Sequence, residues 1–258
     1  MYMLFHFNRF HEAAFMGVSN EVTGRISKQY NNVEYYFNLK KTNEGLVEEN
    51  KRLRNLLEED FLIPDTSSTI MVDSFKVDSL EQYRRYLYFP AKVINNSVTS
   101  QNNYLTLSRG TAQGITKDMS VVGPTGVVGT VINVSKNMAI VMSLLHSETN
   151  VSASLLKSGE TGRVEWDGND PQVITFKNIP KSAQVKKGDT VVTSRYSTFP
   201  PGQPVGVITD IEEQQSSNFY LLKLKPLTNF FNIQFVYIVK NLQKDEQDAL
   251  EKATHKPE

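Results

Sequence analysis

Short apolar runs that alternate with polar residues dominate the chain after residue 90 and restrict its fold most strongly. From Phe231 to Val239 every odd position holds a large apolar residue, and the same period of two occurs in Tyr104–Leu107 and Leu222–Lys225. This period is typical of strands with one buried face. Because no helix-length apolar period separates these runs, we expect a mostly antiparallel sheet, closed as barrels or stacked as sandwiches.

Glycine and proline separate this strand-rich part from the N-terminal part. Residues 1–60 contain no proline, whereas residues 90–240 hold most of the chain's 14 glycines and 10 prolines. The first composition permits a long helix, and the second favours strands joined by turns. We expect a linker over 61–89, in which Pro64 begins a run of turn-forming residues, and a mobile charged tail over 241–258.

Residues 21–60 carry a short heptad register that predicts a coiled coil. One row repeats leucine every seven residues, and a second row with the same spacing lies four positions further on. The rows form an a/d seam in which two successive a positions are Asn, a pattern that favours a two-stranded, in-register dimer. The alternative is one amphipathic helix packed on its own domain. The expected dimer seam is Tyr36, Leu39, Asn43, Leu46, Asn50, Leu53 and Leu57.

A weak internal repeat indicates two related β units. Segment 117–132 resembles segment 187–208, which has a longer central connection. The alternative is that both are unrelated turn–strand segments. We expect the glycines of these segments to serve hairpin turns that need positive φ, because no Lys-Ser/Thr pair of a phosphate loop follows them. The expected turn glycines are Gly123, Gly126, Gly129, Gly188 and Gly206.

Residue types that catalysis and metal binding require are scarce or badly spaced. The chain has no cysteine, which excludes disulfides, thiolate catalysis and iron–sulfur clusters, and its four histidines never fall at metal-ligand spacing. His146 is the only histidine in the strand-rich part, and no Gly-x-Ser-x-Gly turn occurs. Residues 167–170 lack the rest of a calcium loop. We therefore expect no enzyme, no cofactor, no metal and no small-molecule ligand.

The balanced charge argues against nonspecific electrostatic binding to nucleic acid. Lys and Arg total 28, Asp and Glu total 28, and the formal net charge is zero. Met1–Phe7 is apolar but much shorter than the span that a bilayer requires. We interpret residues 1–20 as the remnant or flank of a membrane anchor.

The order of these segments resembles the rod-shape-determining MreC family. After the heptad helix come Pro90–Ile94, Tyr104–Gly110, Met119–Val122, Gly126–Val131 and Lys187–Ser194. The resemblance implies a mainly β chain, with an N-terminal coiled-coil helix followed by two small six-stranded antiparallel β-barrels over residues 90–240. The second barrel is expected around residues 130–200, and insertion of one barrel in the other stays open beside a simple tandem.

The same resemblance implies a non-enzymatic scaffold of the bacterial cell-elongation machinery at the periplasmic face of the inner membrane. The implied partners are a second copy of the chain, MreB, MreD, and the penicillin-binding protein and glycosyltransferase that build peptidoglycan. The family has a full transmembrane helix before the coil, where this chain has only Met1–Phe7.

One proline-rich loop is a candidate for contact with a partner. Its prolines restrict the backbone and lower the ordering cost of binding, so we expect the loop to be exposed. The residues of this loop are Phe199, Pro200, Pro201 and Pro204.

Two other classes of protein stay open. A periplasmic adaptor of a transport system also joins a coiled coil to β-domains, but it places a helical hairpin between two halves of a lipoyl-like domain. A degenerate double-barrel hydrolase would lose activity on some substrate when His146 is changed, whereas a scaffold would show no such loss.

Overall fold

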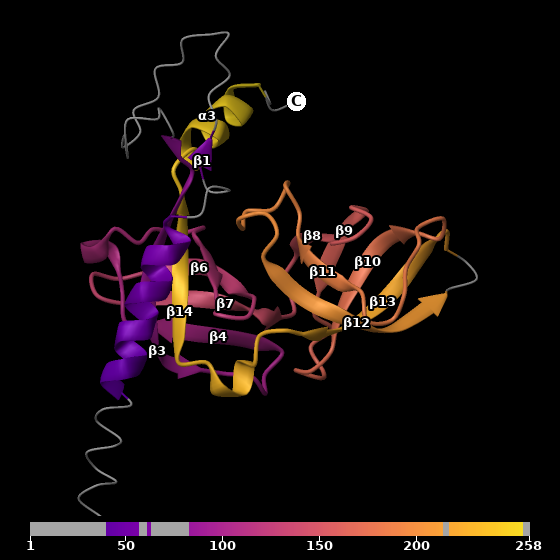
Figure 1. Ribbon diagram of the computed structural model, residues 1–258, viewed down its shortest axis with the longest axis horizontal. Coiled ribbons are helices and arrows are strands. Elements are labelled where there is room, and N and C mark those ends of the chain that lie inside the picture. The colour runs from indigo at the N-terminus through magenta and orange to yellow at the C-terminus, as the bar shows by residue number, and fades with distance from the viewer. Residues whose placement is uncertain (1–39, 57–60, 63–82, 214–216, 255–258) are drawn as a thin grey trace, which may run out of the picture. The chain divides into compact units, whose positions relative to one another are not determined.

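The computed structural model describes residues 40–56, 61–62, 83–213 and 217–254 (Figure 1). An N-terminal helix covers residues 40–54, and helix α3 covers Lys244–Thr254. Short 3₁₀ turns lie at Thr111–Gln113 and Phe230–Asn232. The strands are β1 (Phe61–Leu62), β2 (Tyr83–Arg84), β3 (Tyr86–Asn96), β4 (Asn102–Leu107), β5 (Ser120–Val122), β6 (Val127–Val134), β7 (Ala139–His146), β8 (Val151–Leu155), β9 (Thr161–Glu165), β10 (Ile174–Pro180), β11 (Thr190–Thr193), β12 (Pro204–Glu213), β13 (Phe219–Pro226) and β14 (Phe235–Asn241).

Six strands close into a first barrel in the order β14-β3-β4-β7-β6-β5, and every neighbouring pair is antiparallel. Aliphatic side chains such as Leu105, Val131 and Val141 are fully buried, whereas Tyr104, next to Leu105 on β4, is exposed. This alternation follows from the pleat of the strand, and the burial of the apolar set stabilises the closed sheet.

The second barrel closes in the order β10-β13-β12-β11-β8-β9, again with antiparallel pairs. On β13, Leu222 and Leu224 are fully buried while Lys225 is exposed, as the alternation in the sequence predicts. The prediction of two six-stranded antiparallel barrels is confirmed.

The second barrel is inserted in the first. All of its strands, from Val151 to Pro226, come between β7 and β14 in the sequence. The sequence places this barrel around residues 130–200, but β6 and β7, which end at His146, pair within the first barrel. The pattern of strands alone does not say which barrel a strand completes, because pairing partners lie far apart in the chain.

The ring orders show that the barrels are two copies of one six-strand unit that exchange their last strand. When the two rings are aligned on the hairpins β5–β6 and β11–β12, the other strands correspond in pairs around each ring. These pairs are β7 with β13, β4 with β10, β3 with β9 and β14 with β8. In chain order the two units are β3–β8 and β9–β14, so β8 completes the second barrel and β14 completes the first. Both hairpins also shift register at the same point, after the pairs Val121–Gly129 and Val191–Gly206. The internal repeat of the sequence is therefore a repeat of structure.

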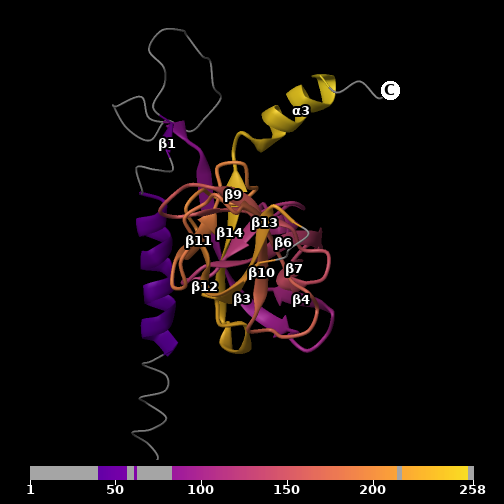
Figure 2. The same ribbon diagram turned by 90° about the vertical axis from the view of Figure 1, so that its right-hand side faces the viewer.

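Two segments outside the barrels differ from the expectation. Strand β3 begins at Tyr86, inside the expected linker over 61–89, and β1 pairs with β2. The expected tail over 241–258 contains helix α3, which has no buried residue (Figures 1 and 2). Lys244 Nζ at its start donates to the carbonyl oxygen of Asp118 at 3.2 Å. Its Glu, Gln, Lys, Ala and Leu residues have high helix propensity, which favours a helix over this segment.

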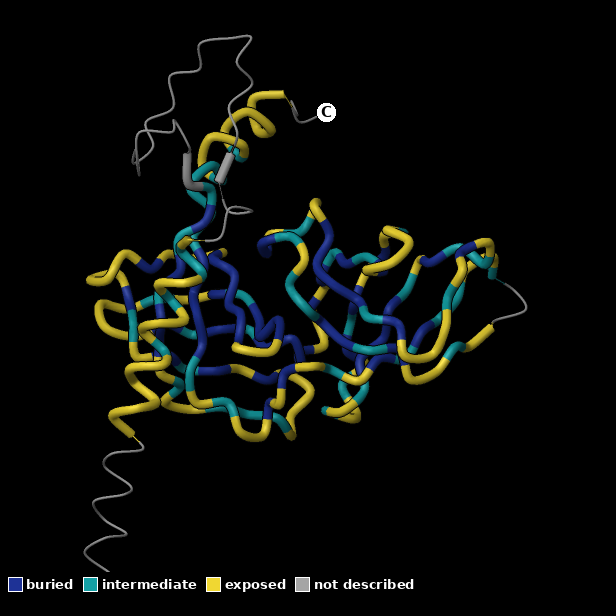
Figure 3. Tube along the Cα trace, in the orientation of Figure 1, coloured by how far each residue is buried: buried dark blue, intermediate teal, exposed yellow. Residues whose placement is uncertain are grey.

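The burial of β14 departs from a simple alternation. Val236, Tyr237, Ile238 and Val239 are all buried, and residues 230–232 form a 3₁₀ turn instead of extending the strand (Figure 3). One face of β14 lines the barrel. The other face is covered at Tyr237 by the end of the N-terminal helix, as described below.

Candidate interaction surfaces

The expected dimer seam lies on an exposed helix wherever it is described. Leu46 and Leu53 keep 57% and 50% of their side-chain surface exposed, and Asn43 and Asn50 are also exposed. Asn50 donates a hydrogen bond from its Nδ2 to the carbonyl oxygen of Leu46 at 2.9 Å. The other seam residues, Tyr36, Leu39 and Leu57, lie outside the described residues.

The end of this helix holds a second, partly buried site. The guanidinium carbon of Arg54 lies 4.9 Å from the ring centroid of Tyr237 and 5.8 Å from that of Tyr88, and Arg54 Nη2 donates to the carbonyl oxygen of Gly123 at 3.4 Å. The Tyr88 amide donates to Asn55 Oδ1 at 3.2 Å. A guanidinium between two aromatic faces is a favourable cation–π arrangement.

Sequence reasoning missed this helix–barrel joint, which we define as Arg54, Asn55, Tyr88 and Tyr237. Arg54 follows the seam residue Leu53. An arginine next to a coiled-coil seam is usually a solvent-exposed residue that flanks the seam. Its aromatic partners lie on strands far along the chain. No local pattern links them, so only the closed barrel reveals the site.

The proline-rich loop is not exposed as predicted. Phe199 is 2% exposed and Pro200 is buried. Thr193 Oγ1 on β11 donates to the carbonyl oxygen of Pro200 at 2.6 Å and ties this part of the loop to the strand. Pro201 and Pro204 are half-buried. Tyr196 is a strongly exposed residue of this connection, at 85%.

The predicted turn glycines serve close backbone approach more than positive φ. Only Gly188 among them has a positive φ, of 90°. A Cβ on Gly126 would lie 2.5 Å from the carbonyl oxygen of Pro204, and one on Gly129 would overlap the carbonyl oxygen of Met142. Gly123 and Gly126 lie at the two ends of the β5–β6 turn, and Gly188 lies in the turn before β11. Gly129 lies on β6 and Gly206 on β12.

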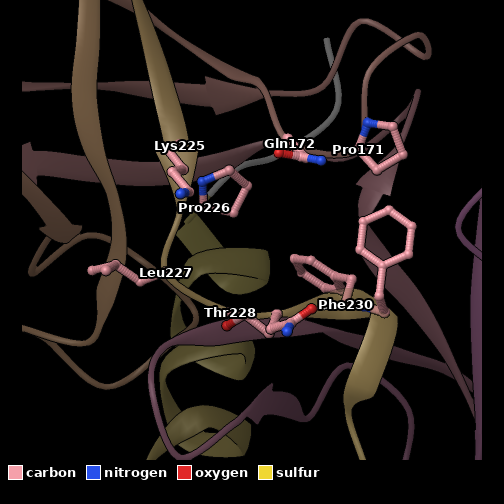
Figure 4. Close-up of a pocket in the computed structure, with 9 residues that line it drawn as sticks. Pro171, Gln172, Lys225, Pro226, Leu227, Thr228 and Phe230 are labelled. Atoms are coloured by element: carbon pink, nitrogen blue, oxygen red, sulfur yellow. Dashed lines mark hydrogen bonds between the residues drawn. The ribbon is translucent and has the colours of Figure 1, made fainter.

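A cavity of about 490 Å³ lies where the chain passes from the second barrel back to the first (Figure 4). Pro171 and Gln172 line it from the β9–β10 connection, and residues 225–231 line it from the end of β13 to the turn before β14. Apolar residues and prolines make up most of this lining, and Lys225 is the one charged residue among the lining side chains.

Two carboxylates near the second repeat have a lowered pKa. Lys157 Nζ and the Lys186 amide donate hydrogen bonds to Asp189, and these bonds lower the pKa of that carboxyl. Lys187 Nζ lies 2.6 Å from an oxygen of Asp210 and lowers its pKa in the same way. Each carboxylate is paired with a lysine, the Asp189 carboxylate in a nearly buried position and that of Asp210 at the surface. Such pairing stabilises a turn rather than poising a general acid or base.

His146 lies in a hydrogen-bonded environment without a serine partner among the described residues. Its Nδ1 accepts from the Glu148 amide at 3.1 Å, and its Nε2 lies 2.9 Å from the hydroxyl of Tyr104. The hydroxyl of the adjacent Ser147 donates to Asn102 at 2.8 Å. His146 therefore links β4 and β7 through its hydrogen bonds and does not have the geometry of a nucleophile–base pair.

Within the described ranges, no three His, Asp or Glu side chains come close enough together to hold a metal ion. The helices over 40–54 and Lys244–Thr254 also fall short of the length and apolar character needed to cross a bilayer.

Comparison with known proteins gives a consistent result. Residues 93–240, more than half of the chain, match the family model for the barrel core of the rod shape-determining protein MreC. The cell shape-determining protein MreC of Listeria monocytogenes is 27% identical over 168 residues, which cover 64% of this chain and 57% of that protein.

Solved structures share the fold. The structure of MreC from Listeria monocytogenes has a TM-score of 0.58 and 25% identity, covering 81% of this chain and 92% of that one. A structure described as the major periplasmic domain of the cell shape-determining filament MreC has a TM-score of 0.52 and 23% identity, covering 61% and 97%. The chain spans less than three fifths of the length of the curated relatives it matches first. On the family model and the two barrels together, the chain belongs to the MreC family of rod shape-determining proteins.

Proposed function

We propose that this chain is a non-enzymatic scaffold of the bacterial cell-elongation machinery. The match of residues 93–240 to the MreC barrel core carries the proposal, because the relatives that share this core are named for determining cell shape. Lys157 and Lys187 pair with carboxylates, and His146 contacts Tyr104, so these groups are assigned structural contacts in this proposal.

The scaffold forms a homodimer through the helix within residues 21–60. Leu46 and Leu53, one heptad apart, expose half or more of their surface along one row of the described helix. Burying the exposed half of each leucine is worth about 1 kcal/mol per residue. A second helix that covers the row recovers this free energy, and Asn43 and Asn50 at a positions then favour two strands in register.

The helix–barrel joint fixes the end of the dimerising helix to the first barrel. Arg54 contacts Tyr88 on β3 and Tyr237 on β14, two strands that pair with each other. Both tyrosines are almost fully buried. In this proposal the dimer sets the spacing of two first barrels, and the strand exchange between the barrels carries that spacing to the second barrels.

The partners follow from the family. They are the penicillin-binding protein and the glycosyltransferase of the elongation complex, together with MreD and MreB, and the place of action is the periplasmic face of the inner membrane. The contact of the proline-rich loop with a partner is retained for Pro201, Pro204 and the exposed Tyr196, and not for the buried Phe199 and Pro200.

Depletion in the organism that encodes the chain tests the proposal. We expect depleted cells to lose their shape and to be rescued by the wild-type chain but not by a variant with Leu46→Asp and Leu53→Asp. A His146→Ala variant is the matched control and is expected to rescue shape. Normal shape after complete depletion would contradict the scaffold function, and failure of the His146→Ala variant at normal protein levels would favour a catalytic role.

A further inference from the structure

The cavity at the crossing between the barrels exposes large apolar side chains on a fixed backbone. Phe231 is 61% exposed and Leu227 is 38% exposed, although the neighbouring Phe230 is 2% exposed. Figure 4 shows Phe230 and Thr228 on one side of the cavity, with Pro171 and Gln172 entering from another segment. An aromatic ring held in water at the rim of a cavity is typical of a contact that a partner completes.

Hydrogen bonds hold one wall of the cavity before any partner binds. Thr228 Oγ1 donates to the carbonyl oxygen of Val127 at 2.8 Å, and Asn96 Nδ2 donates to the carbonyl oxygen of Phe230 at 2.6 Å. The Phe231 amide donates to Asn229 Oδ1 at 3.1 Å. The segment that carries Phe231 is therefore tied to the first barrel, and binding there orders little backbone.

The opposite wall is held by the β9–β10 connection. Trp166 Nε1 donates to the carbonyl oxygen of Asp170 at 2.8 Å, and the Gln172 amide donates to Asp170 Oδ1 at 2.8 Å. The carboxylate of Asp170 is thus engaged with its own turn and does not line the cavity.

The charge of the lining selects the occupant. Lys225 is exposed and is the one ionisable residue among the lining side chains. Its positive charge attracts a carboxylate of an occupant and repels a cation. Prolines beside aromatic rings, with the amides of Gln172 and Asn229 at the rim, suit an extended peptide that offers backbone hydrogen bonds.

We propose that this cavity binds an extended peptide segment of a partner protein, in which a large apolar side chain stands next to an acidic residue. The apolar side chain packs against Phe231 and Pro171, and the acidic residue faces Lys225. The cavity takes lining residues from the second barrel and from the segment that returns to the first, so an occupant contacts both. This surface is distinct from the dimer seam. The inference adds the chemistry of a partner to the proposed scaffold function, and it rests on that function only for the identity of the partner.

Nuclear magnetic resonance titration of the full, isotope-labelled chain tests the proposal with synthetic peptides. The probes are acetyl-Gly-Trp-Glu-Gly-amide and the same peptide with Gln in place of Glu. We expect backbone amide shifts to change at Gln172, Leu227 and Phe231, and the Glu peptide to bind about threefold more tightly than the Gln peptide, as for a partly exposed ion pair. With Lys225→Gln the two peptides should bind equally.

Substitution of exposed aromatic residues gives the matched comparison. Phe231→Ala should weaken the Glu peptide about tenfold. Phe219→Ala removes another exposed phenylalanine, on β13 but outside the cavity lining, and should leave affinity unchanged. Both side chains are exposed, so both variants are expected to fold.

Several results would overturn the proposal. They are no localised shift changes, equal binding of the Glu and Gln peptides by the wild-type chain, or unchanged affinity after Phe231→Ala. Concentration-dependent shifts at the same amides without peptide would assign the cavity to a second copy of the chain instead. None of these results touches the depletion experiment, and a failed shape rescue leaves the titration intact, so the two proposals fail separately.

Discussion

Arg54 places its guanidinium carbon 4.9 Å from the ring centroid of Tyr237, a residue of the last strand of the first barrel. Tyr237 is 2% exposed, and its strand β14 pairs with β3 on one side and β5 on the other. The N-terminal helix thus ends against the strand with which the C-terminal part of the chain closes the barrel. A displacement of this helix end requires a displacement on that face of the barrel.

Replacing Arg54 with Ala should destabilise the chain by about 1–2 kcal/mol, because the cation–π contacts are partly desolvated. Urea unfolding followed by tryptophan fluorescence and circular dichroism measures the loss. Arg195→Ala is the matched control, since Arg195 is an exposed arginine of the β11–β12 connection. Equal stability of the Arg54 and Arg195 variants would show that the joint contributes nothing.

The exchange of β8 and β14 predicts that the two barrels unfold together. Neither unit retains all six strands of a barrel, so residues 83–155 and residues 156–254, made separately, should each fail to fold. The intact chain should show one cooperative transition by calorimetry. Two separated transitions, or native-like dispersion in the spectrum of either half alone, would contradict this prediction.

Phe199 and Tyr196 should separate structure from recognition within one loop. Phe199→Ala opens a cavity at a fully buried ring and should cost about 3–5 kcal/mol of unfolding free energy. Tyr196→Ala changes an 85% exposed side chain and should alter stability by less than about 0.5 kcal/mol. If the loop contacts a partner, Tyr196→Ala should weaken that contact at unchanged stability. A stable Phe199→Ala variant would mean that the loop does not pack as described.

The lowered pKa of Asp189 predicts a dependence of stability on pH. Hydrogen bonds from Lys157 and from the Lys186 amide favour the ionised carboxyl, so its pKa is lower in the folded than in the unfolded chain. Its stabilising contribution is present above about pH 4, the ordinary value, and is lost as the pH falls through the lowered pKa. Asp189→Asn should therefore be less stable than wild type at pH 7, and the difference should shrink toward pH 3.

Unfolding free energies at pH 7, 5 and 3 check this sign. Asp210→Asn is the comparison, because Asp210 is also paired with a lysine but its side chain is 53% exposed, so its effect should be smaller. A difference for Asp189→Asn that stays constant from pH 7 to pH 3 would contradict the assigned cause.

Much of the β architecture could be predicted from the sequence, because it is written in local periods. The alternation in Leu222–Lys225 gives the buried face of β13 directly, and turn residues mark the ends of strands. The family resemblance supplied the number of strands per barrel. The charged composition of the last residues, without large side chains, predicts a tail, whereas the same residues have high helix propensity and form helix α3.

The features that local patterns could not give are those that depend on distant pairing. Nothing near β8 or β14 states that each completes the other unit's barrel. Proline and aromatic residues at 199–201 predict an exposed motif, whereas Phe199 and Pro200 are buried and Thr193 Oγ1 donates to the carbonyl oxygen of Pro200. Arg54 has the sequence context of a coil flank and Phe231 that of an alternating strand. The residues near them in the fold lie on segments brought together only by closure of the barrels.

The solution mass of the full chain, measured by sedimentation equilibrium, tests the central claim most directly. The account predicts a dimer for the wild-type chain, and a monomer of 29.2 kDa after Leu46→Asp with Leu53→Asp, with unchanged circular dichroism of the strands. Lys41→Asp, on the face of the helix away from the seam, should remain a dimer. A wild-type monomer, or a dimer that survives both leucine substitutions, would contradict assembly through the helix.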